Sequence, residues 1–124
     1  MFVIDEDLTI HLTRGDACTL EVSAMNGEEA HTFEAGDLVR LTVVEKNNYG
    51  NVLLSKEVRA SGGEESVAIA LSGKDTTIGD VISKPKDYWY KVKLNPDTQP
   101  QTLIGYDDEG GKVFRLYPGG VSEA

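Results

Sequence analysis

The chain consists of short runs in which apolar and polar residues alternate, each closed by Gly, Pro, Asn or Asp. Alternation with a period of two is typical of a β-strand that buries one face. We therefore predict about seven main strands and one short additional strand at 101–104. The main strands are expected at residues 8–13, 18–24, 38–45, 52–58, 66–71, 88–94 and 113–117.

Turn signals separate these runs, and no helical period of about ten residues or more is present. This spacing favours an all-β, two-sheet antiparallel sandwich of the immunoglobulin-like class. Residues 73–80 are too few and too rich in glycine for a helix, and they predict a single helical or 3₁₀ turn. At 124 residues the chain is expected to form one domain, 1–124, with residues 1–7 and 119–124 frayed.

Charge is distributed unevenly along the chain. The net charge is −9, and residues 1–37 hold nine acidic residues against the single base Arg14. Nucleic acid and anionic membrane surfaces are poor partners for such a chain, because both attract clustered Lys and Arg. The acidic segment is either a solvated face or an interface for a basic partner, in which Asp5, Glu6 and Asp7 would take part.

The sequence does not predict export or membrane insertion. The N-terminus has no basic region followed by an apolar core, so we expect no signal peptide. No apolar run approaches the ~20 residues that span a bilayer. Cys18 is the only cysteine and cannot form an internal disulfide, which fits a reducing compartment.

Recognised catalytic and metal-binding motifs are not found. His11, His31 and Cys18 are too few and too widely spaced for the three or four ligands of a zinc site. The acidic run at 107–110 lacks the EF-hand pattern, and Arg14-Gly15-Asp16, although it matches an adhesive tripeptide, falls where a turn is needed. A carboxylate pair for glycoside hydrolysis stays open as a lesser alternative. We therefore expect a non-enzymatic protein without metal or cofactor.

The predicted strand at 88–94 carries the residues that we expect to form an interface. Trp89, Lys91 and Lys93 share one face of it. Trp89 either lies exposed, where it can stack on a sugar ring or anchor a protein contact, or packs across the other sheet. Lys84 and Lys86 extend this basic stretch. It would pair either with the acidic segment of a neighbouring copy, head to tail, or with the same acidic residues of its own chain.

Six segments follow one another in a characteristic order: LTIHLTRGDACTLEV (8–22), GDLVRLTVVEK (36–46), VAIALSGKDTTI (67–78), YWYKVKL (88–94), QTLI (101–104) and KVFRLYP (112–118). This order resembles the N-terminal β-sandwich of phage baseplate upper proteins and of related small prophage tail proteins.

The resemblance implies a structural or assembly module of a tail or baseplate-like particle. Such a module is made in the bacterial cytoplasm, resides in the virion or phage-like particle, and contacts other particle proteins or itself. The alternative is a carbohydrate-binding, host-recognition module that uses Tyr88, Trp89 and Tyr90 as a stacking platform.

Overall fold

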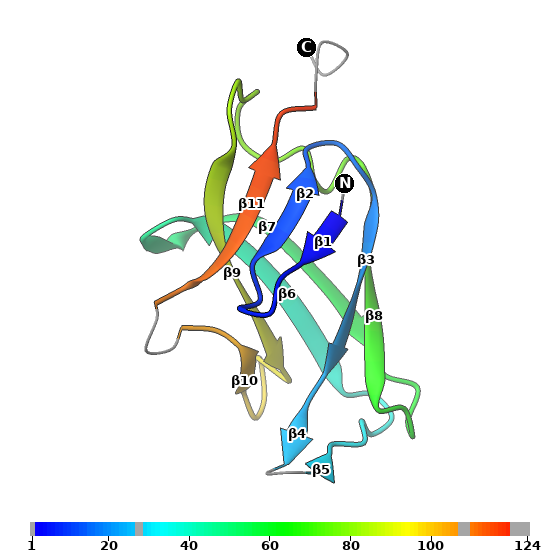
Figure 1. Cartoon of the computed structure of the whole chain (residues 1–124). Coiled ribbons are helices and arrows are strands. Elements are labelled where there is room, and N and C mark those ends of the chain that lie inside the picture. The colour runs from blue at the N-terminus through cyan, green and yellow to red at the C-terminus, as the bar shows by residue number, and fades with distance from the viewer. Residues whose placement is uncertain (1, 27–28, 107–109, 120–124) are drawn as a thin grey trace.

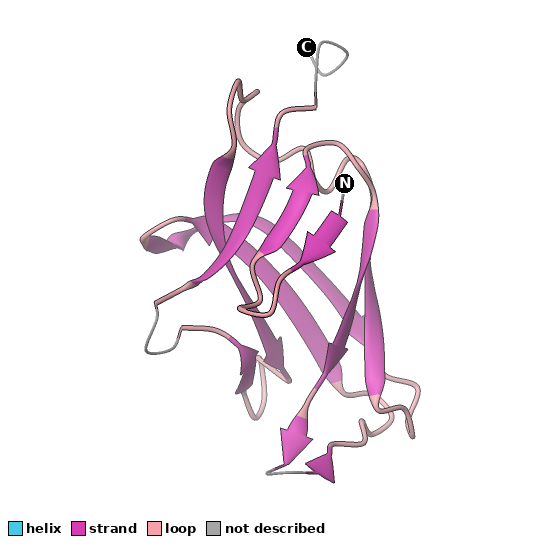
Figure 2. Ribbon diagram, viewed as in Figure 1, coloured by secondary structure: helices cyan, strands magenta, loops and turns pink. Residues whose placement is uncertain are grey.

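The structure is a computed structural model that describes residues 2–26, 29–106 and 110–119. Over these residues it contains strands and turns and no helix (Figures 1 and 2). The strands are β1 (Phe2–Ile4), β2 (Ile10–Thr13), β3 (Cys18–Ser23), β4 (Met25–Asn26), β5 (Glu29–Ala30), β6 (Leu38–Glu45), β7 (Asn48–Arg59), β8 (Ser66–Leu71), β9 (Lys86–Leu94), β10 (Gln101–Ile104) and β11 (Lys112–Tyr117).

One large sheet has the strand order β1-β2-β11-β9-β6-β7, and β10 pairs with β9 beside that path. Its pairs are antiparallel except one: β2 and β11, from opposite ends of the chain, run parallel, with Ile10 opposite Phe114. The prediction of a wholly antiparallel sandwich is therefore wrong at this junction. Both strands run in the same direction through the sheet (Figure 1). Because they come from opposite ends of the chain, no local pattern of residues reveals this pairing.

The second layer is the antiparallel pair β3–β8, while β4 and β5 form a separate two-residue ribbon. Every second residue of β8 is buried, which is the alternation of a strand with one face on the core. These residues pack with the inner face of the large sheet into one core, so the predicted all-β sandwich is confirmed. Its largest fully buried side chains are Tyr88, Tyr90, Phe33, Phe114, Ile10, Leu12, Leu41, Ile69, Leu71 and Leu116. The division into seven strands and two differs from the four and three of an immunoglobulin domain.

The predicted and observed strands agree best where the alternation is longest. The bounds of β6 and β8 are those predicted, whereas β7 begins at Asn48 because a two-residue turn with Asn47 at φ 66° closes the β6–β7 hairpin. Residues 1–7 were expected to be frayed, yet Phe2–Ile4 pair with β2. Of the other segment expected to fray, 119–124, residues 120–124 lie outside the described residues.

The single helical or 3₁₀ turn expected within 73–80 is confirmed over its first residues. The Thr76 amide donates to the Ser72 carbonyl, four residues earlier, over 3.2 Å, and the Thr77 amide donates to the Lys74 carbonyl, three residues earlier, over 3.2 Å. Arg14 holds this segment from the β2–β3 turn: its Nε donates to the Ile78 carbonyl over 3.2 Å and its Nη2 to the Gly79 carbonyl over 2.9 Å. Because Arg14 is only 5% exposed, the adhesive interpretation of Arg14-Gly15-Asp16 fails.

Candidate interaction surface

Strand β9 lies at the centre of the large sheet and separates two sets of side chains. Tyr88, Tyr90 and Val92 face the core and are almost fully buried. Trp89, Lys91 and Lys93 point to the opposite, outer face and are half-buried. The alternation read from the sequence is thus confirmed. It also rules out Tyr88 and Tyr90 as members of a surface stacking platform, because both rings are enclosed by the core.

Trp89 lies in an aromatic cluster on the outer face. Its ring centroid is 5.3 Å from that of Tyr49, on β7, and 6.0 Å from that of Tyr106, which follows β10. A Cβ placed on Gly111 would lie 2.4 Å from the indole Cδ2, so this glycine allows the backbone to cover one side of the ring. Both sequence-based alternatives for Trp89 were incomplete: it faces outward, but neighbouring aromatic groups cover much of it.

The two tyrosines that contact Trp89 differ in exposure: Tyr106 is exposed, and the Tyr49 hydroxyl is buried. Tyr106 is 66% exposed. The Tyr49 hydroxyl is buried, has no hydrogen-bond partner among the described residues, and burial raises the pKa of this phenol. Sequence reasoning missed Tyr49, Tyr106 and Gly111, because three separate segments bring them to Trp89. The asparagines and glycine around Tyr49 indicated a turn and gave no sign of this contact.

Lys91 and Lys93 line two shallow depressions beside the aromatic cluster. One, of about 310 Å³, is bounded by Tyr49, Tyr106 and Thr102; the other, of about 340 Å³, lies toward Arg40 and Asp97. The Lys91 Nζ lies 5.4 Å from the centroid of the Tyr49 ring. In the part of the chain that the structure describes, neither lysine forms an ion pair.

Arg40, the positively charged residue beside these lysines, does form ion pairs. Arg40 is held by two acids, with its Nη2 2.9 Å from Glu57 Oε2 and 2.9 Å from Asp97 Oδ2. Its positive charge is therefore balanced within the chain. Lys91 and Lys93 are the positive charges that this face offers to a partner, together with the aromatic cluster. We call these two lysines with Trp89, Tyr49 and Tyr106 the outer-face surface.

The remaining predicted lysines do not join this surface. Lys86 begins β9 and lies on the other side of the strand, with its Nζ 3.8 Å from Glu45 Oε1 and 5.0 Å from the centroid of the Tyr88 ring. Lys84 is exposed on the segment before it. Lys86 and Lys91 are five residues apart, which corresponds to roughly 17 Å along a strand. The basic stretch of the sequence is thus two separate groups.

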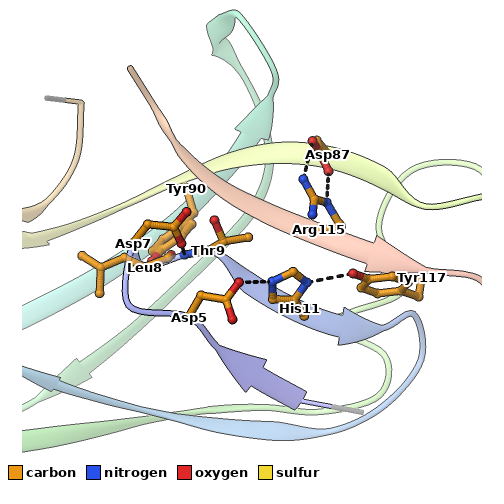
Figure 3. A network of polar contacts seen from close by, with 9 residues as sticks. All are labelled: Asp5, Asp7, Leu8, Thr9, His11, Asp87, Tyr90, Arg115 and Tyr117. Carbon is orange, nitrogen blue, oxygen red and sulfur yellow. Dashed lines mark hydrogen bonds and ion pairs between the residues drawn. The ribbon is translucent and has the colours of Figure 1, made fainter. Parts of the chain in front are cut away.

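The three acidic candidates occupy the turn between β1 and β2, and two of them have partners (Figure 3). Asp5 Oδ2 lies 2.6 Å from His11 Nε2. Asp7 Oδ1 accepts a hydrogen bond from the Thr9 amide over 3.0 Å, which lowers the pKa of this carboxyl. Glu6 is exposed. The turn is negatively charged and well ordered by its own contacts.

A buried tyrosine of β9 also holds the β1–β2 turn against the core. The Tyr90 hydroxyl donates to the Leu8 carbonyl over 2.5 Å, and Leu8 adopts the left-handed conformation with φ 69° (Figure 3). Burial raises the pKa of Tyr90 far above its ordinary value, so the phenol stays protonated and remains a donor.

A polar network extends from Asp5 across the outer face at this end of the sheet. His11 Nδ1 lies 2.8 Å from the Tyr117 hydroxyl, so the imidazole connects Asp5 to the end of β11 (Figure 3). The order carboxylate, imidazole and hydroxyl is that of an acid–base triad, but the hydroxyl is a tyrosine's rather than the serine's of the protease triads. Sequence reasoning found no such arrangement, because His11 and Tyr117 are 106 residues apart.

Arg115 and Asp87 form the ion pair next to this network, with Arg115 Nε 2.6 Å from Asp87 Oδ1. The guanidinium lowers the pKa of the Asp87 carboxyl. A lowered folded-state pKa means that the pair stabilises the protein above the ordinary Asp pKa of ~4 and that this stabilisation is lost as the pH falls further.

We expect Asp87→Asn to reduce the free energy of unfolding by roughly 1 kcal/mol at pH 7, since the pair is partly exposed. The difference from the parent protein should shrink below about pH 4, measured by urea unfolding between pH 2.5 and 7. The matched control is Asp80→Asn, on an exposed bend, which should change stability little at any pH. A loss for Asp87→Asn that is the same at pH 3 and pH 7 would contradict this assignment.

Metal ligands are not grouped in the part of the chain described: no three His, Cys, Asp or Glu side chains lie together there in a way that could hold an ion. The acidic run at 107–109 lies outside those residues. Among the described residues no helix is long and apolar enough to cross a membrane.

Comparison with known proteins supplies no relative for this chain. No protein-family model, no curated protein and no solved structure matches it. Inference about its function therefore depends on the resemblance in segment order and on the outer-face surface.

Proposed function

We propose that this chain is a non-enzymatic structural or assembly module of a phage-tail or baseplate-like particle and acts through protein–protein contacts. Three observations support the proposal. The order of segments over residues 8–118 resembles that of baseplate upper proteins, and the chain folds as an all-β sandwich. The observation that carries it is the outer-face surface.

The composition of the outer-face surface is that of a protein contact. Aromatic rings at its centre supply apolar area that is partly ordered before binding, so fewer side-chain rotamers are lost on association. The shape is shallow, with two depressions on an open sheet face, whereas small-molecule sites are concave and enclose most of the ligand.

The lysines indicate an acidic partner surface. Lys91 and Lys93 have no ion pair in the described part of the chain, and the chain as a whole is acidic, with net charge −9. An acidic face of another particle protein fits them. The acidic β1–β2 turn of a second copy, in which Glu6 is exposed, fits the two lysines as well. This contact joins two different patches and is therefore head to tail, and added salt should weaken it.

The test is whether the chain is part of a particle. Tail-like particles purified from the bacterium that encodes it should contain the chain, detected by mass spectrometry. The double variant Lys91→Glu/Lys93→Glu should be absent from these particles or at least about tenfold depleted, because like charges then face the acidic partner. The matched control, Lys46→Glu/Lys74→Glu, makes the same charge change at two exposed turn lysines and should be retained. Particles without the parent chain would overturn the proposal.

A carbohydrate-binding module is the second candidate, and one observation favours it. Tyr106 is 66% exposed and stands edge-on to Trp89 beside a depression of about 310 Å³, and aromatic faces of this kind stack on sugar rings. Binding of a glycan there should change the fluorescence of Trp89, the only tryptophan of the chain. Glycan-array silence, with no change in Trp89 fluorescence, would remove this candidate.

A further inference from the structure

The edge strand β1 differs from the opposite edge of the large sheet. The sheet ends in β1 on one side and β7 on the other. The β7 edge carries Lys56, Glu57 and Arg59, and charged side chains are a common protection of exposed edges. Strand β1 has no charged residue. Its three apolar side chains are exposed: Phe2 36%, Val3 48% and Ile4 41%. It is an edge without protection.

The free hydrogen-bonding groups of β1 can be identified from its pairing. The Asp5 amide donates to the Thr9 carbonyl over 3.0 Å, so Asp5 occupies a position whose N–H points toward β2. Such positions alternate along an antiparallel ladder, which makes Val3 and His11 a hydrogen-bonded pair. The N–H and C=O groups of Phe2 and Ile4 therefore point away from β2, toward the open edge.

We propose that β1 pairs antiparallel with β1 of a second copy, about a two-fold axis at Val3. In this register Phe2 of one copy lies opposite Ile4 of the other, and each of these two pairs exchanges two backbone hydrogen bonds. All the free groups of Phe2 and Ile4 are then used. The inner row of Phe2 and Ile4 side chains, which continues that of Ile10 and Leu12, is covered by the same residues of the partner copy.

This contact does not involve the outer-face surface. Its dependence on salt is opposite to that of the head-to-tail contact between lysines and acids. Two copies with net charge −9 repel one another, so screening should strengthen an apolar, two-fold contact. A head-to-tail contact between lysines and acids should weaken instead. Because only three residues per copy pair, far less area is buried than in a standard interface, and we expect weak association that is visible at high protein concentration.

Disulfide trapping tests the register directly. Val3 opposite Val3 is a non-hydrogen-bonded pair, with Cα atoms about 4.5 Å apart, within the range of roughly 4.4–6.8 Å that disulfides span. In a Cys18→Ala background, Val3→Cys should form a covalent dimer under mild oxidation. The matched control is Ile4→Cys, of similar exposure. Its two copies would be two positions out of register, roughly 8 Å apart and out of reach.

We expect at least about tenfold more dimer for Val3→Cys than for Ile4→Cys at equal time and concentration. Equal cross-linking of the two variants would overturn the register and the proposal with it.

A second measurement uses the intact contact without cysteine. Sedimentation equilibrium of the parent protein should show dimers whose affinity rises between 20 and 500 mM salt. Ile4→Pro removes an outward N–H that makes no bond to β2, and edge strands tolerate proline there. It should weaken the dimer by about tenfold while leaving the thermal melt nearly unchanged. Association that falls with salt and is unaffected by Ile4→Pro would overturn β1 pairing and leave the head-to-tail contact as the interface.

Discussion

Replacing Phe114 with alanine is expected to lower the free energy of unfolding by about 4 kcal/mol, the largest effect that we anticipate for a single substitution. Phe114 is fully buried on β11, opposite Ile10 of β2 and Tyr88 of β9, and its ring centroid is 6.4 Å from that of Tyr90. The truncation would leave a cavity where the N-terminal strands join the rest of the sheet. Since small domains have only about 5–15 kcal/mol of stability, urea unfolding at 25 °C should show a large shift in midpoint.

The neighbouring residue provides the control. Val113 is on the same strand but points to the outer face, opposite Trp89, and is only partly buried. Val113→Ala should therefore reduce stability by about 1 kcal/mol or less. Similar losses for the two variants would mean that β11 is not ordered as described.

Arg14→Ala is expected to reduce stability by about 3 kcal/mol, the second-largest effect. The guanidinium is buried and makes charge-assisted hydrogen bonds to the carbonyls of Ile78 and Gly79. Removal leaves these acceptors without their donor and releases the segment that precedes β9. Arg14→Lys should recover only part of the loss, because a lysine has one ammonium group where the arginine presents a planar fork.

Arg59→Ala is the matched control for Arg14. Arg59 is exposed, and its Nη1 donates to the Gly36 carbonyl over 3.1 Å at the surface. Water can replace that hydrogen bond, so we expect a loss below about 1 kcal/mol in the same urea titration. If Arg14→Ala were no more destabilising than Arg59→Ala, the buried arginine would not be what holds the 73–80 turn.

Local alternation was sufficient to predict the strands that line the core. In β8 and β9 every second residue is buried, so sequence spacing and side-chain direction agree. The same rule placed Trp89, Lys91 and Lys93 together on one face. It could not show what covers Trp89. Tyr49, whose ring contacts the indole, lies at the end of the β6–β7 pair where the register shifts between Val43 and Glu45, and such irregularities leave no periodic signal.

The predictions that failed depend on contacts between distant segments. Strand β1 is too short to show alternation, and it is a strand because β2 presents an open edge beside it. The sequence places Arg14 in a turn but gives no sign of its buried partners, which are more than sixty residues further along the chain. Spacing also gave no sign of the Asp5–His11–Tyr117 network, which connects the β1–β2 turn to β11.

The parallel pairing of β2 with β11 also has a consequence for how the protein is made. His11 and Tyr117 lie 106 residues apart, so β2 receives its neighbour only after the intervening residues have been synthesised. At ~5–20 residues per second, a ribosome needs roughly 5–20 s to translate that interval. Throughout this time the nascent β2 has no β11 to pair with, and the large sheet can be completed only after β11 has been synthesised.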